Sequence, residues 1–350
     1  MAPIYQGTRL PTSYATCSVG HHPSHDLPAK LAAISAAGFE AIELSMPDIL
    51  SYAEKLNNQP CDPQDFDTLV QVASQIRSLA ASHSLRILML QPFANFEGWD
   101  PTTHPTERAD AFTRAAGWFR IATAAGTDML QVGSSDSPSI ASSHLDTLAD
   151  DLRALCDLAA PLNIRICYEN WCWATHAPTW KDVWAIVQKV DRPNIGLCLD
   201  TFQSAGGEYG DPTTASGLIE NVSKLDLDER WKASLHGLVA SVPAEKIFVL
   251  QISDAYRLQP PLANEPDQDG LRPRGQWSHD HRPLPYEGGY LPIVGFLRAT
   301  LDTGFRGVLS VEVFDAREKD RGRTMEDMTR AAMKDLERMV REAEEMKSEQ

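Results

Sequence analysis

Short apolar runs alternate with longer amphipathic segments along nearly the whole chain. Eight runs have the length and composition of buried strands, and they cover residues 14–19, 41–44, 87–91, 129–132, 165–169, 195–200, 247–253 and 308–313. Continuous apolar strands that alternate with helices are typical of a parallel sheet covered by helices. Eight such units in one chain predict an α/β fold, a closed (β/α)8 TIM barrel.

The segments between these runs have the spacing of amphipathic helices, at residues 27–37, 65–82, 105–125, 144–160, 180–190 and 291–303. Gly38, Gly126 and Gly304 stand where three of these helices would end. Glycine accepts the left-handed conformation that commonly ends a helix. Residues 324–350 form a charged stretch with methionines on one side, which predicts an outer helix of the barrel.

Two long stretches interrupt the alternation. Residues 201–238 follow the sixth predicted strand and end in a charged segment of helical character, and residues 256–290 follow the seventh and are rich in proline, glycine and charge. Connections of this length in a compact domain are usually functional or disordered, and both leave the end of the barrel where active sites lie. We therefore expect a single TIM-barrel domain over residues 1–350, with long loops after strands six and seven.

The formal net charge of −16 limits which partners the protein is expected to bind. An acidic chain repels nucleic acid and anionic membranes, and it needs a local positive group to bind an anionic substrate. No stretch approaches the about 18 apolar residues of a membrane helix, and the first twenty residues lack the apolar core of a signal peptide. The six cysteines form no disulfide framework. These features predict a cytoplasmic protein with reduced thiols and leave its oligomeric state open.

Four consecutive predicted strands carry metal-ligand side chains at their ends, namely Glu169, Asp200, Gln251 and Glu312. The ends of neighbouring strands converge at one mouth of a barrel, so these oxygen donors would share a site. Three carboxylates together repel one another unless a cation is bound, although each alone would equally fit a helix cap or a salt bridge. The set predicts one divalent ion, Mg²⁺ or Mn²⁺ in the first place and Co²⁺ in the second.

These strand ends resemble those of the xylose-isomerase-like barrels, which include sugar isomerases, epimerases and endonuclease IV. Over roughly residues 12–340 the chain is also similar to the 3-dehydroshikimate dehydratases of quinate catabolism. The similarity is carried by Leu-Gln-Pro-Phe-Ala-Asn-Phe-Glu-Gly at 90–98, Tyr-Glu-Asn-Trp-Cys-Trp at 168–173, Leu-Asp-Thr-Phe-Gln at 199–203, Leu-Gln-Ile-Ser-Asp-Ala at 250–255 and Trp-Ser-His-Asp-His-Arg at 277–282.

The resemblance assigns roles to individual residues. It implies that the four strand-end residues are the metal ligands, with Gln251 where relatives often have histidine. It also implies that Ser278 and Arg282 contact the substrate. Arg282 fits independently, because arginine offers a planar fork for a carboxylate, although a surface arginine in a polar loop is the alternative.

The chain departs from the bacterial members of this group at two positions. They have an arginine where this chain has Ala94 and a histidine where it has Gln203. Glutamine cannot act as a general base, so the proton-transfer residue must be another group. The sequence as a whole is more similar to that of the fungal members.

Histidine is the natural candidate because its pKa near 6.5 suits proton transfer. His176 ranks first, seven residues beyond Glu169 and among Trp171, Trp173 and Trp180. The other candidates are His279, His281, His21 and His22. Each histidine would equally fit a solvated loop, and the tryptophans would equally fit packing.

The resemblance implies the dehydration of 3-dehydroshikimate to protocatechuate, with Glu169 and Glu312 near the reacting atoms and a small carboxylate-bearing molecule as the substrate. A ketose isomerase or epimerase on the same scaffold could use these two glutamates as acid and base. A non-catalytic small-molecule binder is a third reading, and an endonuclease is disfavoured because the chain is acidic.

Overall fold

The computed structural model describes residues 2–20, 22, 24–140 and 144–346. Eight parallel strands close into a barrel in which β11 pairs with both β9 and β3. The strands are β3 (Thr12–Ala15), β4 (Ala41–Ser45), β5 (Arg86–Phe93), β6 (Met129–Gly133), β7 (Arg165–Glu169), β8 (Ile195–Asp200), β9 (Ile247–Ile252) and β11 (Val308–Val311). The predicted TIM barrel is confirmed.

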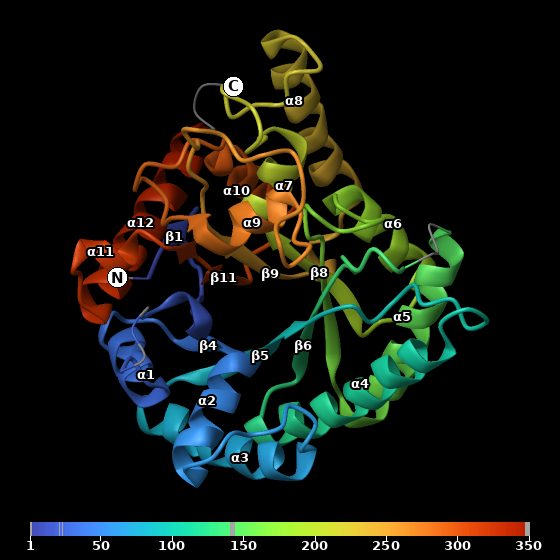
Figure 1. The fold of residues 1–350 in the computed structure, drawn as a ribbon. Coiled ribbons are helices and arrows are strands. Elements are labelled where there is room, and N and C mark those ends of the chain that lie inside the picture. The colour runs from blue at the N-terminus through green and yellow to red at the C-terminus, as the bar shows by residue number, and fades with distance from the viewer. Residues whose placement is uncertain (1, 21, 23, 141–143, 347–350) are drawn as a thin grey trace.

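Helices surround the barrel, as Figure 1 shows. They are α1 (Leu27–Ala36), α2 (Met46–Asn57), α3 (Phe66–Ser82), α4 (Pro105–Ala125), α5 (Leu145–Ala159), α6 (Trp180–Val190), α7 (Thr201–Glu208), α8 (Lys224–Ser241), α9 (Pro273–Asp280), α10 (Ile293–Asp302), α11 (Glu318–Arg321) and α12 (Met325–Glu345). The predicted C-terminal helix is α12, which packs against α1 and α10 and buries Met328, Met333 and Met339. Within the described part of the chain, no helix has both the length and the apolar character needed to cross a membrane.

The first predicted strand was placed too late in the sequence. Residues 14–19 were expected to be extended, whereas β3 ends at Ala15 and the 3-10 helix η1 (Thr16–Ser18) follows it. The polar residues Thr12 and Ser13 begin β3 and are fully buried. Apolar content alone cannot separate a short strand from the turn that follows it.

Two helices were missed because each begins directly at the end of a strand. Ser45 ends β4 and caps α2 by accepting a hydrogen bond from the Asp48 backbone N–H. Asp200 ends β8 and caps α7 in the same way through the Gln203 backbone N–H, at 2.9 Å. The predicted loop at residues 201–238 therefore begins as a helix, and its charged end is α8.

The long segment after β9 is fixed to the barrel. Its short strand β10 (His281–Arg282) pairs antiparallel with β12 (Phe314–Asp315), which follows β11. The pairing sets Arg282 opposite Phe314. This places Arg282 beside the C-terminal end of β11, where the predicted ligand Glu312 lies.

Candidate functional site

The interior of the barrel has an apolar floor with a polar layer above it. Most of the floor consists of one buried residue from each of seven strands: Ala41, Met89, Met129, Cys167, Cys198, Val249 and Val308. The layer consists of the residues two positions further along the same strands: Glu43, Gln91, Gln131, Glu169, Asp200, Gln251 and Ser310. Side chains alternate along a strand, so residues two apart face the same side. The site is thus built by a period of two on neighbouring strands.

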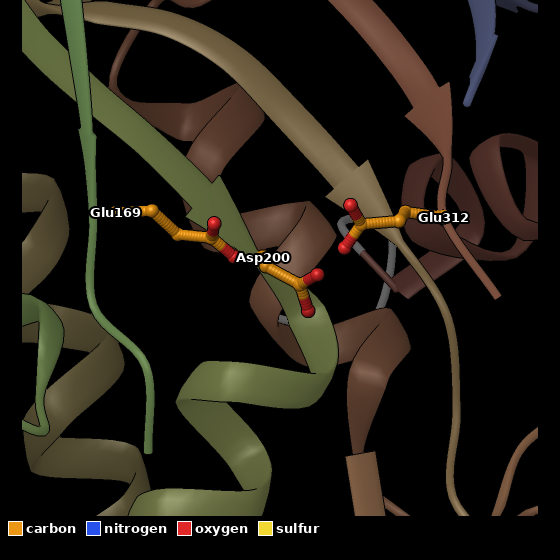
Figure 2. Close-up of side chains that lie close together, drawn as sticks. All are labelled: Glu169, Asp200 and Glu312. Carbon is orange, nitrogen blue, oxygen red and sulfur yellow. The ribbon is translucent and has the colours of Figure 1, made fainter. Parts of the chain in front are cut away.

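Three of the four predicted ligands meet in this structure. Glu169, Asp200 and Glu312 each present a carboxylate oxygen, and these atoms all lie within 4.8 Å of one another. Figure 2 shows Glu169 and Glu312 extending toward Asp200 from opposite sides. All three residues are buried. A group of this kind could hold a metal ion.

The electrostatics of the triad favour a bound cation. Burial, together with the charges of Glu312 and Asp200, raises the pKa of Glu169 well above its ordinary value. Burial also raises the pKa of Asp200, and it raises that of Glu312 to about 7 although Arg282 opposes the shift. A carboxylate that is desolvated beside like charges favours its neutral form. A divalent ion would remove that penalty by supplying the missing charge.

The fourth predicted ligand, Gln251, lies beside the triad, since the strand register pairs it with Asp200. Its Nε2 donates a 2.9 Å hydrogen bond to Glu43 Oε2. Its Oε1 is buried and has no hydrogen-bond partner among the described residues, and the same holds for Oε1 of Glu169. Buried oxygens without partners are rare. These two, with the other carboxylates, are the donors that a hard divalent ion binds.

Arg282 lies closer to the predicted metal ligands than the sequence indicated. Its Nη2 donates to Asp200 Oδ2 at 2.5 Å and to Glu312 Oε2 at 3.2 Å, and the side chain is 1% exposed. Its Nη1 is 3.3 Å from the Ser278 hydroxyl. The guanidinium therefore offsets part of the carboxylate charge while one edge turns toward the predicted substrate contact Ser278.

A cavity of about 450 Å³ adjoins these groups and is lined by Glu169, Glu312, Ser278 and Arg282. One wall is aromatic, because the rings of Trp171 and Trp173 stack at 5.1 Å with an interplanar angle of 16°. The Trp171 Nε1–H donates to Glu169 Oε2 at 3.1 Å. The cavity thus combines a flat apolar surface with a charged base, which suits a small, ring-shaped polar molecule.

A family model described as the xylose isomerase-like TIM barrel matches residues 31–346. The chain belongs to the xylose isomerase-like TIM barrel family. The 3-dehydroshikimate dehydratase of Neurospora crassa is 33% identical over 321 residues, and the match covers 89% of this chain and 86% of that protein. A Pseudomonas aeruginosa protein of the same name is 34% identical over 303 residues, 87% of this chain and 38% of that longer protein.

Solved structures agree with the family assignment. A xylose isomerase-like TIM barrel/4-hydroxyphenylpyruvate dioxygenase fusion protein is 27% identical, with a TM-score of 0.72 over 97% of this chain and 45% of its own. The IOLI protein, which was solved with a bound zinc atom, is 19% identical, with a TM-score of 0.68 over 95% of this chain and 99% of its own. The second likeness extends to the fold alone.

The candidate histidines differ in whether they line the cavity. His176 does not line the cavity, and its Nε2 lies 2.9 Å from the carbonyl oxygen of Ile140. The geometry therefore gives no support to its first rank as the proton-transfer residue. His279 does line the cavity and contacts Trp173 edge-on, with ring centroids 6.0 Å apart. Sequence separation from Glu169 was a poor guide because it carries no information on the direction in which a loop side chain points.

Of the remaining candidates, the two that the structure describes, His22 and His281, do not line the cavity. His281 forms part of β10, His22 lines a different surface hollow, and His21 lies outside the described residues. Trp180 donates from Nε1 to the Ser234 hydroxyl at 2.9 Å and is buried, which is the packing role considered for it.

Both positions that depart from the bacterial pattern face the cavity. Ala94 leaves room there, and Gln203 is buried with its Oε1 accepting a 2.9 Å hydrogen bond from the Cys172 backbone N–H. Gln203 is thus held by the backbone of the loop after β7.

Three polar residues of the layer that contact predicted ligands were missed from the sequence. Gln91 Nε2 donates to Glu312 Oε1 at 3.0 Å, Gln131 Nε2 donates to Glu169 Oε2, and Glu43 accepts from Gln251. Their positions follow from the same alternation as the ligands, since each stands two residues beyond a floor residue. A polar residue inside an otherwise apolar strand was the available indication.

Proposed function

We propose that this protein is a metal-dependent 3-dehydroshikimate dehydratase that forms protocatechuate. The observation that carries this function is the convergence of Glu169, Asp200 and Glu312 beneath an aromatic-walled cavity. It occurs in a chain whose fungal and bacterial relatives bear that name.

The same convergence supports the choice of metal. Glu169, Asp200, Gln251 and Glu312 would hold one divalent ion, and an all-oxygen donor set favours Mg²⁺ or Mn²⁺, with Co²⁺ as the next candidate. When bound, the ion supplies Lewis-acid stabilisation of the negative charge that develops on the substrate's ketone oxygen.

Arg282 and Ser278 are the proposed substrate contacts. Of the described residues that line the cavity, Arg282 is the single arginine or lysine, so it is the available fixed positive charge for the carboxylate of 3-dehydroshikimate. Its Nη1 faces Ser278, whose hydroxyl would complete the carboxylate contact. A metal ion shared by Asp200 and Glu312 would weaken the hold of these two residues on the guanidinium.

Dehydration removes the proton at C4, expels the C5 hydroxyl as water and then moves a C6 proton to the C3 oxygen, which yields the aromatic ring. We infer that His279 takes the C4 proton, in preference to His176. Desolvation and the nearby charge of Arg282 lower the pKa of His279, which keeps its imidazole neutral and able to accept a proton at neutral pH. Glu169 and Glu312 are less suited to this step, because a bound cation would hold them ionised and occupy their oxygens.

The other parts of the proposed function concern the setting of the reaction. The net charge of −16 and the single cavity arginine support a small carboxylate-bearing substrate rather than nucleic acid or a membrane surface. A cytoplasmic location and one barrel domain over residues 1–350 complete the proposal.

The decisive experiment is turnover by the chelator-stripped protein after addition of one metal at a time. We expect 3-dehydroshikimate to give protocatechuate, followed by its ultraviolet absorbance, with Mg²⁺, Mn²⁺ or Co²⁺ and none in chelator. Undiminished turnover in chelator, or no turnover with any of the three ions, would refute the proposal. Epimerisation of a ketose in the same assay would support the isomerase reading instead.

A further inference from the structure

Glu43 is a buried carboxyl group that the dehydration reaction does not use. It lies on β4 inside the barrel and is fully buried. Its sequence neighbours Ile42 and Leu44 are apolar core residues. A buried ionisable group without a role is costly, since desolvation disfavours its charged form.

The contacts of Glu43 lead to the metal ligands. Its Oε2 accepts from Gln251 Nε2 at 2.9 Å and from Gln91 Nε2 at 3.4 Å. Gln91 in turn donates to Glu312 Oε1 at 3.0 Å. Glu43 therefore touches two amides, one of which is a proposed ligand and the other of which holds a ligand.

The contact with Gln251 has a direction. An amide group has a donating end and an accepting end, and here the donating Nε2 of Gln251 faces an accepting oxygen, Oε2 of Glu43. When Nε2 faces Glu43, the amide oxygen must turn away from it. That Oε1 is one of several buried oxygens of the polar layer that have no hydrogen-bond partner among the described residues.

The polar layer, together with Arg282 of β10, gives each proposed ligand a partner of the opposite kind. Donors serve the three carboxylates: Gln131 serves Glu169, Arg282 serves Asp200 and Gln91 serves Glu312. An acceptor serves the amide, because Glu43 is the partner of Gln251. This complementarity explains why a carboxylate, rather than a fourth amide, stands at position 43.

We propose that Glu43 is a positioning residue that holds the Gln251 amide with its oxygen toward the ion bound by Glu169, Asp200 and Glu312. The role presupposes the metal-dependent activity proposed above. Groups that orient metal ligands commonly contribute about 10–100-fold to metal affinity. With Glu43 in place, the amide enters the site in one orientation instead of two.

The test is direct Mn²⁺ binding by the chelator-stripped, full-length protein, measured by calorimetry. In Glu43→Gln the new amide can present either end to Gln251, so the orientation is lost, and we expect the affinity to fall about 10–100-fold. Glu97→Gln is the matched control, because Glu97 is also a buried glutamate but contacts Ser135 and Tyr168 and does not line the cavity. Its affinity should stay within twofold of the unchanged protein.

Reversing the pair separates orientation from a merely structural role. Gln251→Glu alone sets two carboxylates in contact and should also weaken binding. The double variant Glu43→Gln with Gln251→Glu restores one donor and one acceptor, and we expect it to recover at least tenfold of the lost affinity. A general packing defect would instead accumulate across the two substitutions.

Three outcomes would overturn the inference. The first is a Glu43→Gln variant that is folded, as judged by circular dichroism, and binds Mn²⁺ as tightly as Glu97→Gln does. The double variant could bind no better than the weaker single variant, which also decides the matter if Glu43→Gln does not fold. Failure of the unchanged protein to bind Mn²⁺ would remove the metal site and the proposed function together, whereas normal binding without dehydration would remove the proposed function alone.

Discussion

The floor and the polar layer of the barrel interior lie on the same strands, two residues apart, yet burial of their side chains has opposite effects on the stability of the fold. Cys167 and Cys198 in the floor are followed by Glu169 and Asp200 in the layer. Burial of floor side chains stabilises the fold, because apolar surface leaves water. Burial of layer carboxylates raises their pKa values and opposes folding without a cation. One geometric rule thus produces both a core and a binding site.

Among the predicted changes, replacing a carboxylate of the polar layer should have the largest effect on activity. In Glu169→Gln the amide keeps the size of the side chain but loses a charged metal ligand, so we expect turnover to fall on the order of 10³-fold. Because the pKa of Glu169 is raised in the folded protein, its ionised form opposes folding. Removing the charge should therefore leave the metal-free protein equally stable or more stable at pH 8. Steady-state rates and thermal melts check both parts, with Glu97→Gln as the control.

A second contrast concerns two histidines, one that lines the cavity and one that does not. His279 is the inferred base there, whereas His176 points to the Ile140 carbonyl. We expect His279→Gln to lower kcat about 10²-fold or more, the usual contribution of general base catalysis, and to leave Mn²⁺ affinity unchanged. His176→Gln is the matched control and should lose less than threefold. The reverse order of the two effects would restore His176 as the base.

A floor substitution should show the complementary pattern. Met89 is fully buried two residues before Gln91, and Met89→Ala removes its buried side chain and leaves a cavity. We expect a loss of about 2–5 kcal/mol in the free energy of unfolding, measured by denaturant titration. Mn²⁺ affinity of the folded variant should change less than threefold. A larger loss of affinity would mean that the floor positions the layer instead of merely supporting it.

The barrel and the convergence of three of the predicted ligands could be predicted from the sequence, but the hydrogen bonds that hold these side chains could not. Glu169, Asp200 and Glu312 could be predicted because each ends or follows an apolar strand, and strand ends converge in a barrel. The position of Glu43 inside an apolar run was visible in the sequence, but its role was not, because that role depends on contacts with residues of other strands. Hydrogen bonds such as that from Gln251 to Glu43 join residues 208 positions apart, and no local pattern encodes them.

Arg282 shows a second limit of the sequence. Its positive charge predicted a contact for a substrate carboxylate, but the pairing of β10 with β12 also brings it to Asp200 and Glu312. Two short strands, one after β9 and one after β11, create that contact. The substrate role for Arg282 is therefore a proposal about the edge of the guanidinium that faces Ser278.

The smallest expected effect is the pH dependence of the metal-free protein. Burial, with the charge of Glu312, raises the pKa of Glu43 to about 8, and burial raises that of Glu312 to about 7, from ordinary values near 4.5. Between pH 4.5 and 8 the folded protein therefore binds more protons than the unfolded chain, so its stability must fall as the pH rises through this window. We expect the melting temperature in chelator to drop by a few degrees from pH 5.5 to pH 8.

Metal should reverse this trend, because a bound cation favours the ionised carboxylates and binds more tightly as protons leave. With saturating Mn²⁺, the melting temperature at pH 8 should equal or exceed that at pH 5.5. Glu43→Gln should flatten the slope measured in chelator, since one of the titrating groups is gone, whereas Met89→Ala should lower the whole curve without changing its slope. A slope that Mn²⁺ and Glu43→Gln both leave untouched would mean that the titrating groups are neither in the polar layer nor Glu312. It would end the contrast between layer and floor.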